Sequence, residues 1–281
     1  MPVYKVPCRF GKIFEVGEFF TDIPNIKRDT LLVVRTENGM QLATALKPPT
    51  LAEGIEQLPD SPKVLRIATV DDKERQKELE TVREKEAMAY CKEQIKNLNL
   101  TMRLLDVEYL FGGEKILFYY VAPERVDFRE LVRILAHKYH TRIEMRQLGV
   151  RDAARLVLDF SHCGEELCCR RFLKEFKPVS VRTARLQKTT LDPSKISGAC
   201  GRLMCCLLYE DFLYAELKKN IPEREEKVRT ERGEAVVIGY NIIEQTVTVQ
   251  YEGGERETLP ASQIVRIAPL QPEKEEELRF D

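Results

Sequence analysis

The sequence lacks any long apolar segment. Its 281 residues contain no run of 18 apolar residues, and no apolar stretch of the signal-peptide kind follows Met1. A helix that spans a bilayer needs about 20 such residues, and a secretory signal needs a shorter apolar core near the N-terminus. We therefore expect a protein that neither spans a membrane nor is secreted, and that lies in the cytoplasm.

The motifs of the common enzyme classes are also missing. The chain has no P-loop, no Gly-x-Gly-x-x-Gly after a strand, no His-Glu-x-x-His and no Gly-x-Ser-x-Gly. The cysteine-rich segment 163–206 has less histidine and carboxylate than the triad of a metalloenzyme needs. The sequence therefore predicts a protein that is not an enzyme, and any catalysis would have to come from its cysteines.

The chain has no excess of charge of either sign. Its 45 lysines and arginines oppose 46 aspartates and glutamates, which gives a formal net charge of −1. Binding to nucleic acid would therefore have to come from a local patch. Hydrophobic residues make up 43% of the chain and charged residues 32%, a mixture typical of globular domains, of which the length predicts two or three.

Cysteine is abundant in one place. Six of the eight cysteines lie in a window of 44 residues that begins with Cys-Gly-Glu-Glu-Leu-Cys-Cys (163–169) and ends with Cys-Gly-Arg-Leu-Met-Cys-Cys (200–206). The template Cys-Gly-x-x-x-Cys-Cys thus occurs twice. Without secretion a disulfide framework is not expected, and reduced thiols that bind a metal are favoured.

The candidate metal ligands are the cysteines of these two copies. They are Cys163, Cys168, Cys169, Cys200, Cys205 and Cys206. Several thiolates together select zinc, copper(I) or an iron–sulfur cluster, and the Cys-x-x-Cys knuckle of structural zinc sites is missing. We therefore favour a [4Fe–4S] cluster, with zinc as the alternative and packing or redox thiols as a further interpretation.

Six thiols exceed the four that one [4Fe–4S] cluster needs. They allow one complete cluster with two spare cysteines, or two centres that are each completed by a partner's cysteine. Adjacent cysteines on a helix point about 100° apart, so one of each pair could face a metal while the other packs inward. Gly164 and Gly201 permit a tight turn after the first cysteine of each copy. The isolated Cys8 and Cys91 are expected in the core.

A basic stretch lies between the two copies. From Cys168 to Lys188 it has seven basic residues and one acid, Glu175. These basic residues have three interpretations: they favour the thiolate form of the nearby cysteines, they contact RNA phosphates, or they form a solvated helix face. The sequence shows no aromatic platform of the RNA-recognition-motif kind. The candidate RNA-contacting residues are Arg170, Arg171, Lys174, Arg182, Arg185 and Lys188.

The predicted fold class is α+β, beginning with a β-rich domain and linker over residues 1–62. Strands are expected in Tyr4–Val16, Thr30–Thr36 and Met40–Leu46, and the last two flank a hairpin turn at Glu37-Asn38-Gly39. Four prolines between residues 48 and 62 indicate the linker.

Residues 63–150 have the order β-α-β-β-α-β, which predicts a ferredoxin-like domain. The expected strands are Val64–Val70, Met102–Phe111, Lys115–Val121 and Thr141–Leu148, and Gly112-Gly113 joins the middle two. One helix is expected from a cap at Asp71-Asp72 to about Asn97, and a second over Phe128–Tyr139.

Residues 151–222 are predicted to form a Cys-rich, mostly helical module that holds the metal cluster. Its expected helices are Arg170–Phe176, a short one from Ser194 to Ile196, and Leu203–Leu217. Residues 223–281 are predicted as a small SH3-like β-barrel followed by an acidic tail. The barrel strands are expected at Ala235–Tyr240, Thr246–Tyr251 and Ile264–Ile267, with a hairpin turn at Gly253-Gly254.

Three segments resemble the PSP1 C-terminal domain family. They are Val-Asp-Phe-Arg-Glu-Leu-Val (126–132), Thr-Arg-Ile-Glu-Met-Arg-Gln-Leu-Gly-Val-Arg-Asp (141–152) and Pro-Ser-Lys-Ile-Ser-Gly-Ala-Cys-Gly-Arg-Leu-Met-Cys-Cys-Leu-Leu-Tyr-Glu (193–210). Together with the N-terminal β segment, the resemblance covers about residues 1–215.

This resemblance implies a non-catalytic subunit of a cytoplasmic complex of three proteins, whose other members are two small helical proteins of the YlbF and YmcA type. It implies [4Fe–4S] clusters held by the six cysteines. It also implies a specificity factor for the endoribonuclease RNase Y in mRNA maturation, with influence on sporulation, competence and biofilm formation. Two alternatives stay open: a thiol or electron-transfer protein that uses the vicinal cysteines, and a direct RNA-binding protein that uses the 168–188 patch.

Overall fold

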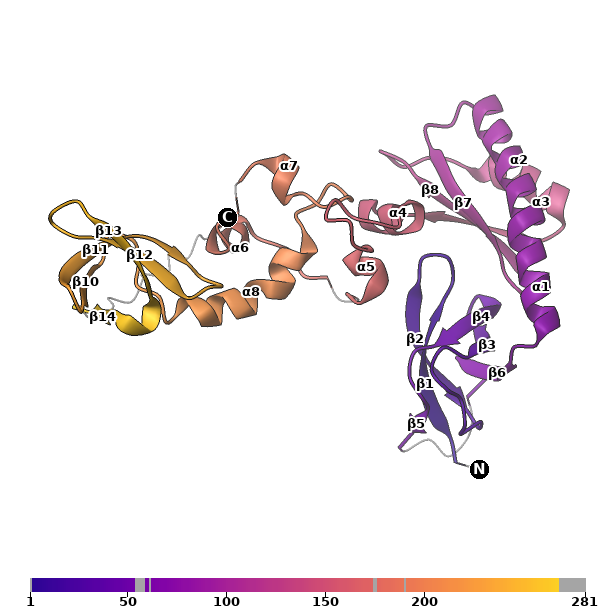
Figure 1. Ribbon diagram of the computed structural model, residues 1–281. Coiled ribbons are helices and arrows are strands. Elements are labelled where there is room, and N and C mark those ends of the chain that lie inside the picture. The colour runs from indigo at the N-terminus through magenta and orange to yellow at the C-terminus, as the bar shows by residue number, and fades with distance from the viewer. Residues whose placement is uncertain (1, 54–58, 61, 174–175, 190, 268–281) are drawn as a thin grey trace. The chain divides into compact units, whose positions relative to one another are not determined.

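A computed structural model describes residues 2–53, 59–60, 62–173, 176–189 and 191–267 (Figure 1). Two compact units divide the chain. Unit 1 comprises Met1–Glu175 with Ala199–Arg202, and unit 2 comprises Phe176–Gly198 with Leu203–Asp281. The described residues contain no helix long and apolar enough to cross a membrane. The predicted acidic tail, Pro272–Asp281, lies outside the described residues.

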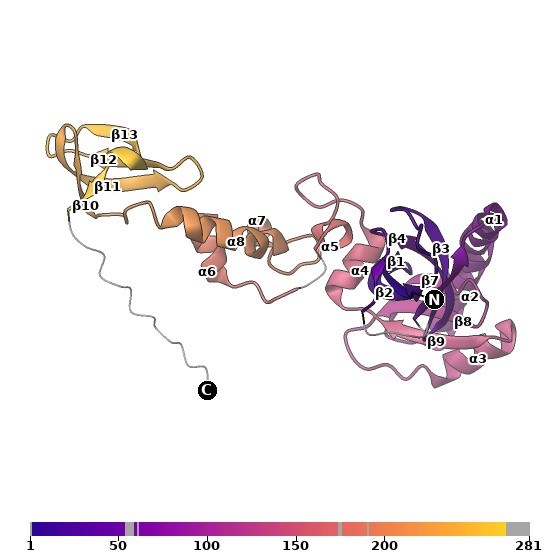
Figure 2. The ribbon, with the colours of Figure 1, turned by 90° about the horizontal axis from the view of Figure 1, so that it is seen from below.

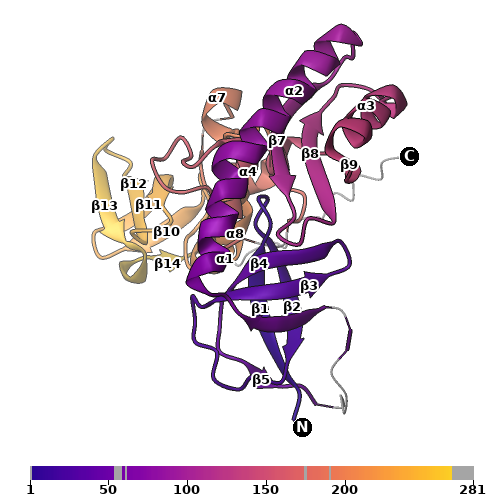
Figure 3. The same cartoon turned by 90° about the vertical axis from the view of Figure 1, so that its right-hand side faces the viewer.

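Unit 1 begins with a β-sheet that closes on itself (Figure 3). Its strands are β1 (Tyr4–Phe10), β2 (Glu15–Thr21), β3 (Leu31–Thr36), β4 (Gly39–Ala45), β5 (Thr50–Leu51) and β6 (Lys63–Ile67). β1 pairs with β2 and β4, β3 pairs with β4 and β6, and β6 also runs parallel to β2. Val6, Phe19 and Leu32 fill the interior, so the β-rich N-terminus is confirmed as a small barrel.

The first predicted strand of this barrel is two strands. Tyr4–Val16 is interrupted by a turn in which Gly11 and Phe14 both have positive φ. The chain therefore reverses before Glu15, and β2 was missed. The hairpin predicted around Asn38 is confirmed, because Thr36 pairs with Gly39 across a two-residue connection.

The strand predicted to open the ferredoxin-like domain belongs instead to the barrel. β6 is antiparallel to β3, and its Val64 is buried beside Leu32 and Val34. The β-α-β-β-α-β prediction is therefore wrong in its first strand. Local sequence identifies a strand but not the strand with which it pairs. Here β6 pairs with the otherwise open edge of β3.

A three-stranded sheet and its helices form the rest of unit 1. Their bounds are α1 (Val70–Glu78), a π-helical turn (Leu79–Arg83), α2 (Glu84–Asn97), β7 (Arg103–Tyr109), β8 (Lys115–Val121), α3 (Arg129–Tyr139), β9 (Arg142–Gln147), α4 (Val150–Val157) and α5 (Cys168–Arg171). β8 lies between an antiparallel β7 and a parallel β9. α2 and α3 cover one face, where Cys91, Phe118 and Leu135 are buried (Figure 1).

The other face of this sheet packs against the barrel. Ile13 of the barrel meets Leu117 and Tyr119 of β8 in a shared apolar cluster. Nearby, Lys12 Nζ lies 2.7 Å from Glu84 and 2.9 Å from Asp106. These contacts join the barrel and the α/β part into one unit.

The described residues of unit 2 form three helices and a five-stranded β-barrel (Figure 2). The elements are α6 (Val181–Leu186), α7 (Pro193–Ile196), α8 (Cys205–Lys218), β10 (Lys227–Thr230), β11 (Gly233–Asn241), β12 (Thr246–Gln250), β13 (Arg256–Pro260), a 3-10 turn (Ala261–Gln263) and β14 (Val265–Arg266). The strand order is β13-β12-β11-β10-β14, all antiparallel. The three predicted strands are confirmed, and β10 and β13 were missed.

The C-terminal barrel shares its core with α8. Tyr214, Leu217 and Ile221 pack with the buried barrel residues Val237 and Val249. Gln245 Nε2 also donates a hydrogen bond of 3.0 Å to the carbonyl oxygen of Leu217. The end of the Cys-rich segment is thus part of the barrel's own hydrophobic core.

Candidate metal centre

The first Cys-Gly-x-x-x-Cys-Cys copy forms a tight hairpin that leads into a helical turn. An isolated antiparallel bridge joins Phe160 and Glu166 on either side of Cys163, and Gly164 has φ +82°. The helical turn α5 begins at Cys168. Cys163 is exposed, Cys168 is half-buried and Cys169 is buried, so the copy offers thiols of three different exposures.

The second copy repeats this arrangement. An isolated antiparallel bridge joins Ser197 and Leu203 on either side of Cys200, and Gly201 has φ +77°. The helix α8 begins at Cys205. Cys200, Cys205 and Cys206 are all half-buried.

Backbone hydrogen bonds occur at the same offsets in both copies. In the first, the Leu167 N–H donates to Asp159 O (3.1 Å) and the Arg170 N–H to Leu167 O (2.8 Å). In the second, the Met204 N–H donates to Ile196 O (2.9 Å) and the Leu207 N–H to Met204 O (3.2 Å).

The residues before the two helices also agree in backbone angles. Leu167 has φ −51° and ψ 124°, and Met204 has φ −57° and ψ 123°. The sequence repeat is therefore a repeat of structure, although the two following helices differ in length. Each copy places one cysteine in a hairpin and two at the start of a helix.

The six cysteines belong to both units. The three of the first copy and Cys200 are in unit 1, and Cys205 and Cys206 are in unit 2. Over the described residues, no three His, Cys, Asp or Glu side chains are grouped as metal ligands. The donor set itself fits a soft metal or an iron–sulfur cluster, because every candidate is a thiol.

The other two cysteines are core residues, as predicted. Cys8 is buried in the N-terminal barrel, and Cys91 is buried on the inner face of α2. Burial raises the pKa of each thiol to about 12, so both stay protonated at neutral pH.

Two of the candidate RNA-contacting residues form ion pairs next to the first copy. Arg170 pairs with Asp159 and lies 3.7 Å from Glu166, and Arg171 lies 3.3 Å from Glu165. The Arg170 guanidinium also stacks over the Phe14 ring, 4.5 Å from its centroid. These arginines therefore fix the first hairpin to its surroundings in unit 1.

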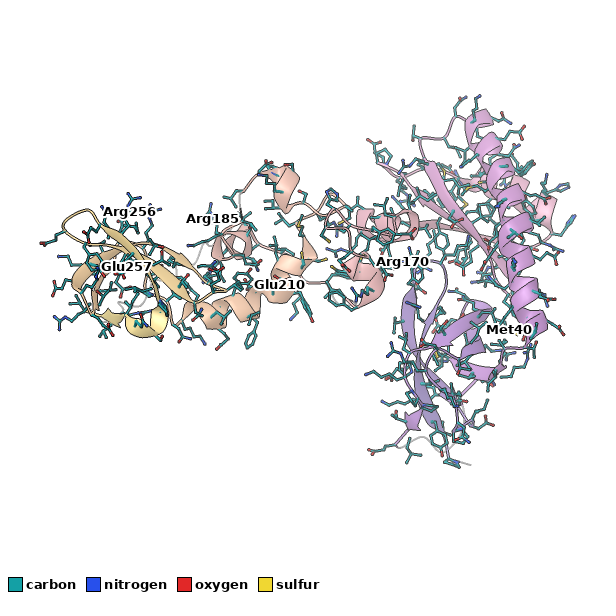
Figure 4. All side chains as sticks on the ribbon, in the orientation of Figure 1. Met40, Arg170, Arg185, Glu210, Arg256 and Glu257 are labelled. Atoms are coloured by element: carbon teal, nitrogen blue, oxygen red, sulfur yellow. The ribbon has the colours of Figure 1, made fainter. Side chains whose placement is uncertain are left out.

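The remaining candidates lie in different settings. Arg182 and Arg185 are exposed on α6, and Lys174 lies outside the described residues (Figure 4). Lys188 Nζ donates a 2.5 Å hydrogen bond to Tyr240 O and sits over the Tyr240 ring. Burial, with a smaller effect of Lys218, lowers the pKa of Lys188. The five basic residues that the structure describes are thus divided between the two units.

Sequence reasoning missed a polar cleft in unit 1. It has a volume of about 590 Å³ and is lined by Arg9, Gln41, Lys73, Lys77 and Glu108 among others. Gln41 Oε1 is buried and accepts no hydrogen bond from any described residue. Tyr119 Oη donates a 2.5 Å hydrogen bond to Glu108, and burial raises the pKa of that carboxyl. No spacing rule connects these residues, because barrel and sheet bring them together.

It also missed that α8 exposes large apolar side chains. Phe212 lies in the predicted helix Leu203–Leu217, and it is among the most exposed apolar residues that the structure describes. The signal was available, because Leu207 and Phe212 are five positions apart and lie about 140° apart around a helix.

Two parts of the chain match known protein families. Residues 62–148 match the PSP1 C-terminal conserved region, and residues 178–221 match the third domain of PSP1-like proteins. The first match covers the α/β part of unit 1 together with β6. The second covers α6, α7 and α8, and with them the second cysteine copy.

Similarity to one bacterial protein extends along most of the chain. The stage 0 sporulation protein YaaT of Bacillus subtilis (strain 168) is 38% identical over 252 residues, which are 89% of this chain and 91% of YaaT. No solved structure matches. YaaT is named for sporulation and not for a catalytic activity.

Two yeast proteins share a shorter segment. An uncharacterized protein of Schizosaccharomyces pombe is 45% identical over 62 residues, or 22% of this chain and 8% of that protein. Protein PSP1 of Saccharomyces cerevisiae is 46% identical over 44 residues, or 16% of this chain and 5% of that protein. Neither name denotes a catalytic activity.

Proposed function

The chain belongs to the PSP1 family, and from this premise we propose that it is a non-catalytic subunit of a cytoplasmic regulatory complex. The complex contains two small helical proteins of the YlbF and YmcA type. It acts as a specificity factor for RNase Y in mRNA maturation and so influences sporulation, competence and biofilm formation. Similarity to a sporulation protein over 89% of the chain supports this proposal.

The observation that carries the metal-binding part is the repeated backbone of the two cysteine copies. Two segments 37 residues apart have the same bridge, the same left-handed glycine and the same cysteine pair at a helix start. Packing alone gives no reason to keep three cysteines in each. We assign a [4Fe–4S] cluster to this set, with zinc as the alternative. The residues that would hold it are Cys163, Cys168, Cys169, Cys200, Cys205 and Cys206.

A bound cluster would supply metal–thiolate bonds that fix the hairpins and a group able to change its redox state. The chain's own contribution is to present the thiols. Gly164 and Gly201 turn the backbone, and the bridges hold each hairpin closed. Cys205 and Cys206 occupy the first turn of the 14-residue helix α8, where the positive end of the helix dipole favours negative charge.

The test is the metal content of protein purified without oxygen, alone and with the two helical proteins. We expect a broad visible absorption with matching iron and sulfide. Cys200→Ala and Cys205→Ala should lose the absorption and weaken binding of the helical proteins, because metal binding stabilises the folded segment. Cys8→Ala is the matched control, since Cys8 is a buried barrel residue.

The same samples test the regulatory role when they are added to RNase Y and one transcript. We expect the loaded complex, and not the Cys205→Ala complex, to change the positions of cleavage. If the purified protein is colourless and contains zinc, the bound group is a structural zinc ion and not an iron–sulfur cluster. Cysteine variants that keep both partner binding and the cleavage pattern would contradict the proposal.

A further inference from the structure

α8 presents a stripe of large apolar side chains to solvent. The exposed fraction is 62% for Tyr209, 76% for Phe212 and 51% for Leu213. Positions i, i+3 and i+4 lie on one face of a helix, so the three side chains form a continuous surface, here called the apolar stripe. Grouped exposed apolar residues of this size indicate an interaction site more often than scattered ones do.

The opposite face of α8 is firmly packed. Leu207 is buried against Ala184 of α6, and Tyr214 and Leu217 join the core of the C-terminal barrel. Gln187 Nε2 also donates a 2.6 Å hydrogen bond to Leu207 O. The face of α8 opposite the apolar stripe is therefore packed against α6 and the C-terminal barrel.

The apolar stripe is continuous with the cysteine pair. Cys205, Tyr209 and Phe212 are spaced i, i+4 and i+7, so one face of α8 carries a candidate metal ligand and the apolar stripe. A molecule that lies along this face also reaches the start of the helix.

The charge around the apolar stripe is negative. Glu210 and Asp211 lie beside the apolar stripe on α8, whereas Glu216 pairs with Lys219 and the one base of the helix, Lys218, is its last residue. Neither Glu210 nor Asp211 forms an ion pair with any residue that the structure describes, and Figure 4 shows Glu210 extending from α8. This charge disfavours RNA and anionic lipid surfaces as occupants.

A second copy of the chain is disfavoured for the same reason. A two-fold dimer through the apolar stripe would place identical acidic residues near one another. A helix with an apolar face and basic edges complements both the shape and the charge, because side-chain ridges of one helix pack into the grooves of another. α8 is about 21 Å long, enough for three to four turns of such a partner.

We propose that the apolar stripe of Tyr209, Phe212 and Leu213 is the docking surface for an amphipathic, basic-edged helix of a partner protein. The inference rests on the proposed function, which supplies two small helical proteins as the partners. The inference adds the surface that these partners bind. It also places the docking surface on the helix that begins with Cys205 and Cys206 of the second cysteine copy.

The test measures binding of the purified full-length chain to the two helical proteins. We expect Phe212→Ala combined with Leu213→Ala to weaken binding at least about 30-fold, as for residues at the centre of an interface. Ile243→Ala is the matched control, because Ile243 is 53% exposed in the turn between β11 and β12 of the same unit. Unchanged iron content and thermal unfolding in both variants would show that the fold is kept.

A charge variant provides the second measurement. Glu210→Lys should slow association several-fold and reduce its dependence on salt, because opposite charges steer the encounter of the two proteins. An unchanged association rate for Glu210→Lys would contradict the inference that the partner helix has basic edges.

The remaining outcomes separate the inference from the proposed function. If the chain binds the helical proteins and the Phe212→Ala, Leu213→Ala variant binds them equally well, the docking surface is wrong while the proposed function stands. If the unmodified chain binds neither protein, the proposed function fails and the inference with it. If Phe212→Ala instead converts a dimer of the chain alone to monomer, the occupant is a second copy and the inference is overturned.

Discussion

At the scale of single residues, Asp72 organises the start of α1. Arg66 Nη2 donates to its carboxylate (2.9 Å), as do the backbone N–H (2.8 Å) and the hydroxyl (3.0 Å) of Thr69. The Thr69 hydroxyl in turn accepts from the Asp72 N–H, which completes a capping box. The hydrogen bonds from Arg66, and then those from Thr69, hold the pKa of Asp72 well below its usual range.

Asp72→Asn should therefore lower stability in a pH-dependent way. The pKa is lower in the folded chain than in the unfolded chain, so the charged carboxylate stabilises the fold above roughly pH 4. This contribution is lost as pH falls below that value. We expect the free energies of unfolding in urea to differ between variant and unmodified protein at neutral pH and to converge in acid.

Asp71→Asn is the control for this prediction, because Asp71 is the exposed neighbour in the same first turn. It should leave the pH dependence of unfolding unchanged. A constant difference between Asp72→Asn and the unmodified protein at every pH would contradict the assignment.

The sequence located this cap only in part. Two acids at residues 71–72 correctly indicated a helix start, but the capping residue is Thr69. The prediction missed it because Asp71 and Asp72 are themselves good caps, and the reciprocal pair is recognised only from the spacing of Thr69 and Asp72. The exposure of Phe212 was missed for a different reason, since α8 has apolar side chains on two faces and only one of them meets a core.

At the scale of elements, the repeated hairpins depend on left-handed glycines. Gly164 and Gly201 have φ of +82° and +77°, and a Cβ added at either would meet no atom within 4 Å. The cost of a side chain there is therefore conformational and not steric crowding. For an L-residue that cost is roughly 1–2 kcal/mol.

Gly201→Ala should lower the free energy of unfolding by about 1–2 kcal/mol, while Gly201→Asn should cost less because asparagine tolerates this conformation better. Urea unfolding measures both. Gly149→Ala is the matched control, because a Cβ added at Gly149 would also meet no atom within 4 Å, but its φ is −71°. An equal effect of Gly149→Ala and Gly201→Ala would contradict the conformational explanation.

Most elements were predictable where turn signals flank a regular pattern. The strand Lys115–Val121 agrees with its prediction at both ends, and the helix predicted from Phe128 begins at Arg129. β2 was missed because the predicted strand ends at Val16, directly before Gly17. In the structure Gly17 lies inside the strand, and a Cβ there would approach the Phe10 ring to 3.3 Å. A glycine that makes room for a neighbouring ring has the same appearance in sequence as a turn glycine.

At the scale of the whole molecule, each unit has a hydrophobic core of its own. Leu135 of α3 is fully buried in unit 1, and Ile221 is buried in the barrel core of unit 2. The sequence indicated modules of this kind but not where the units divide. The cysteine repeat was visible as one window, whereas the unit boundary passes through it. Repeat spacing reports local geometry and carries no information on which core each segment joins.

Leu135→Ala and Ile221→Ala should each destabilise by about 2–5 kcal/mol, because both leave a cavity in a core. We expect each variant to speed amide hydrogen exchange in its own unit and not in the other. Exchange resolved by mass spectrometry of peptides measures this, with each variant as the control for the other. Faster exchange throughout both units in either variant would show that they unfold as one.

The closing strand β6 has a consequence for how the barrel is made. β6 is the last barrel strand to be synthesised, and only Ala68 and Thr69 separate it from α1. Until it emerges from the ribosome, β3 has an open edge of unpaired backbone groups, and such edges recruit strands from other chains. A nascent or truncated chain that stops at residue 62 is thus in its most aggregation-prone form. Five residues later the edge is covered, and the chain continues directly into the helix that the Arg66–Asp72 pair joins to it.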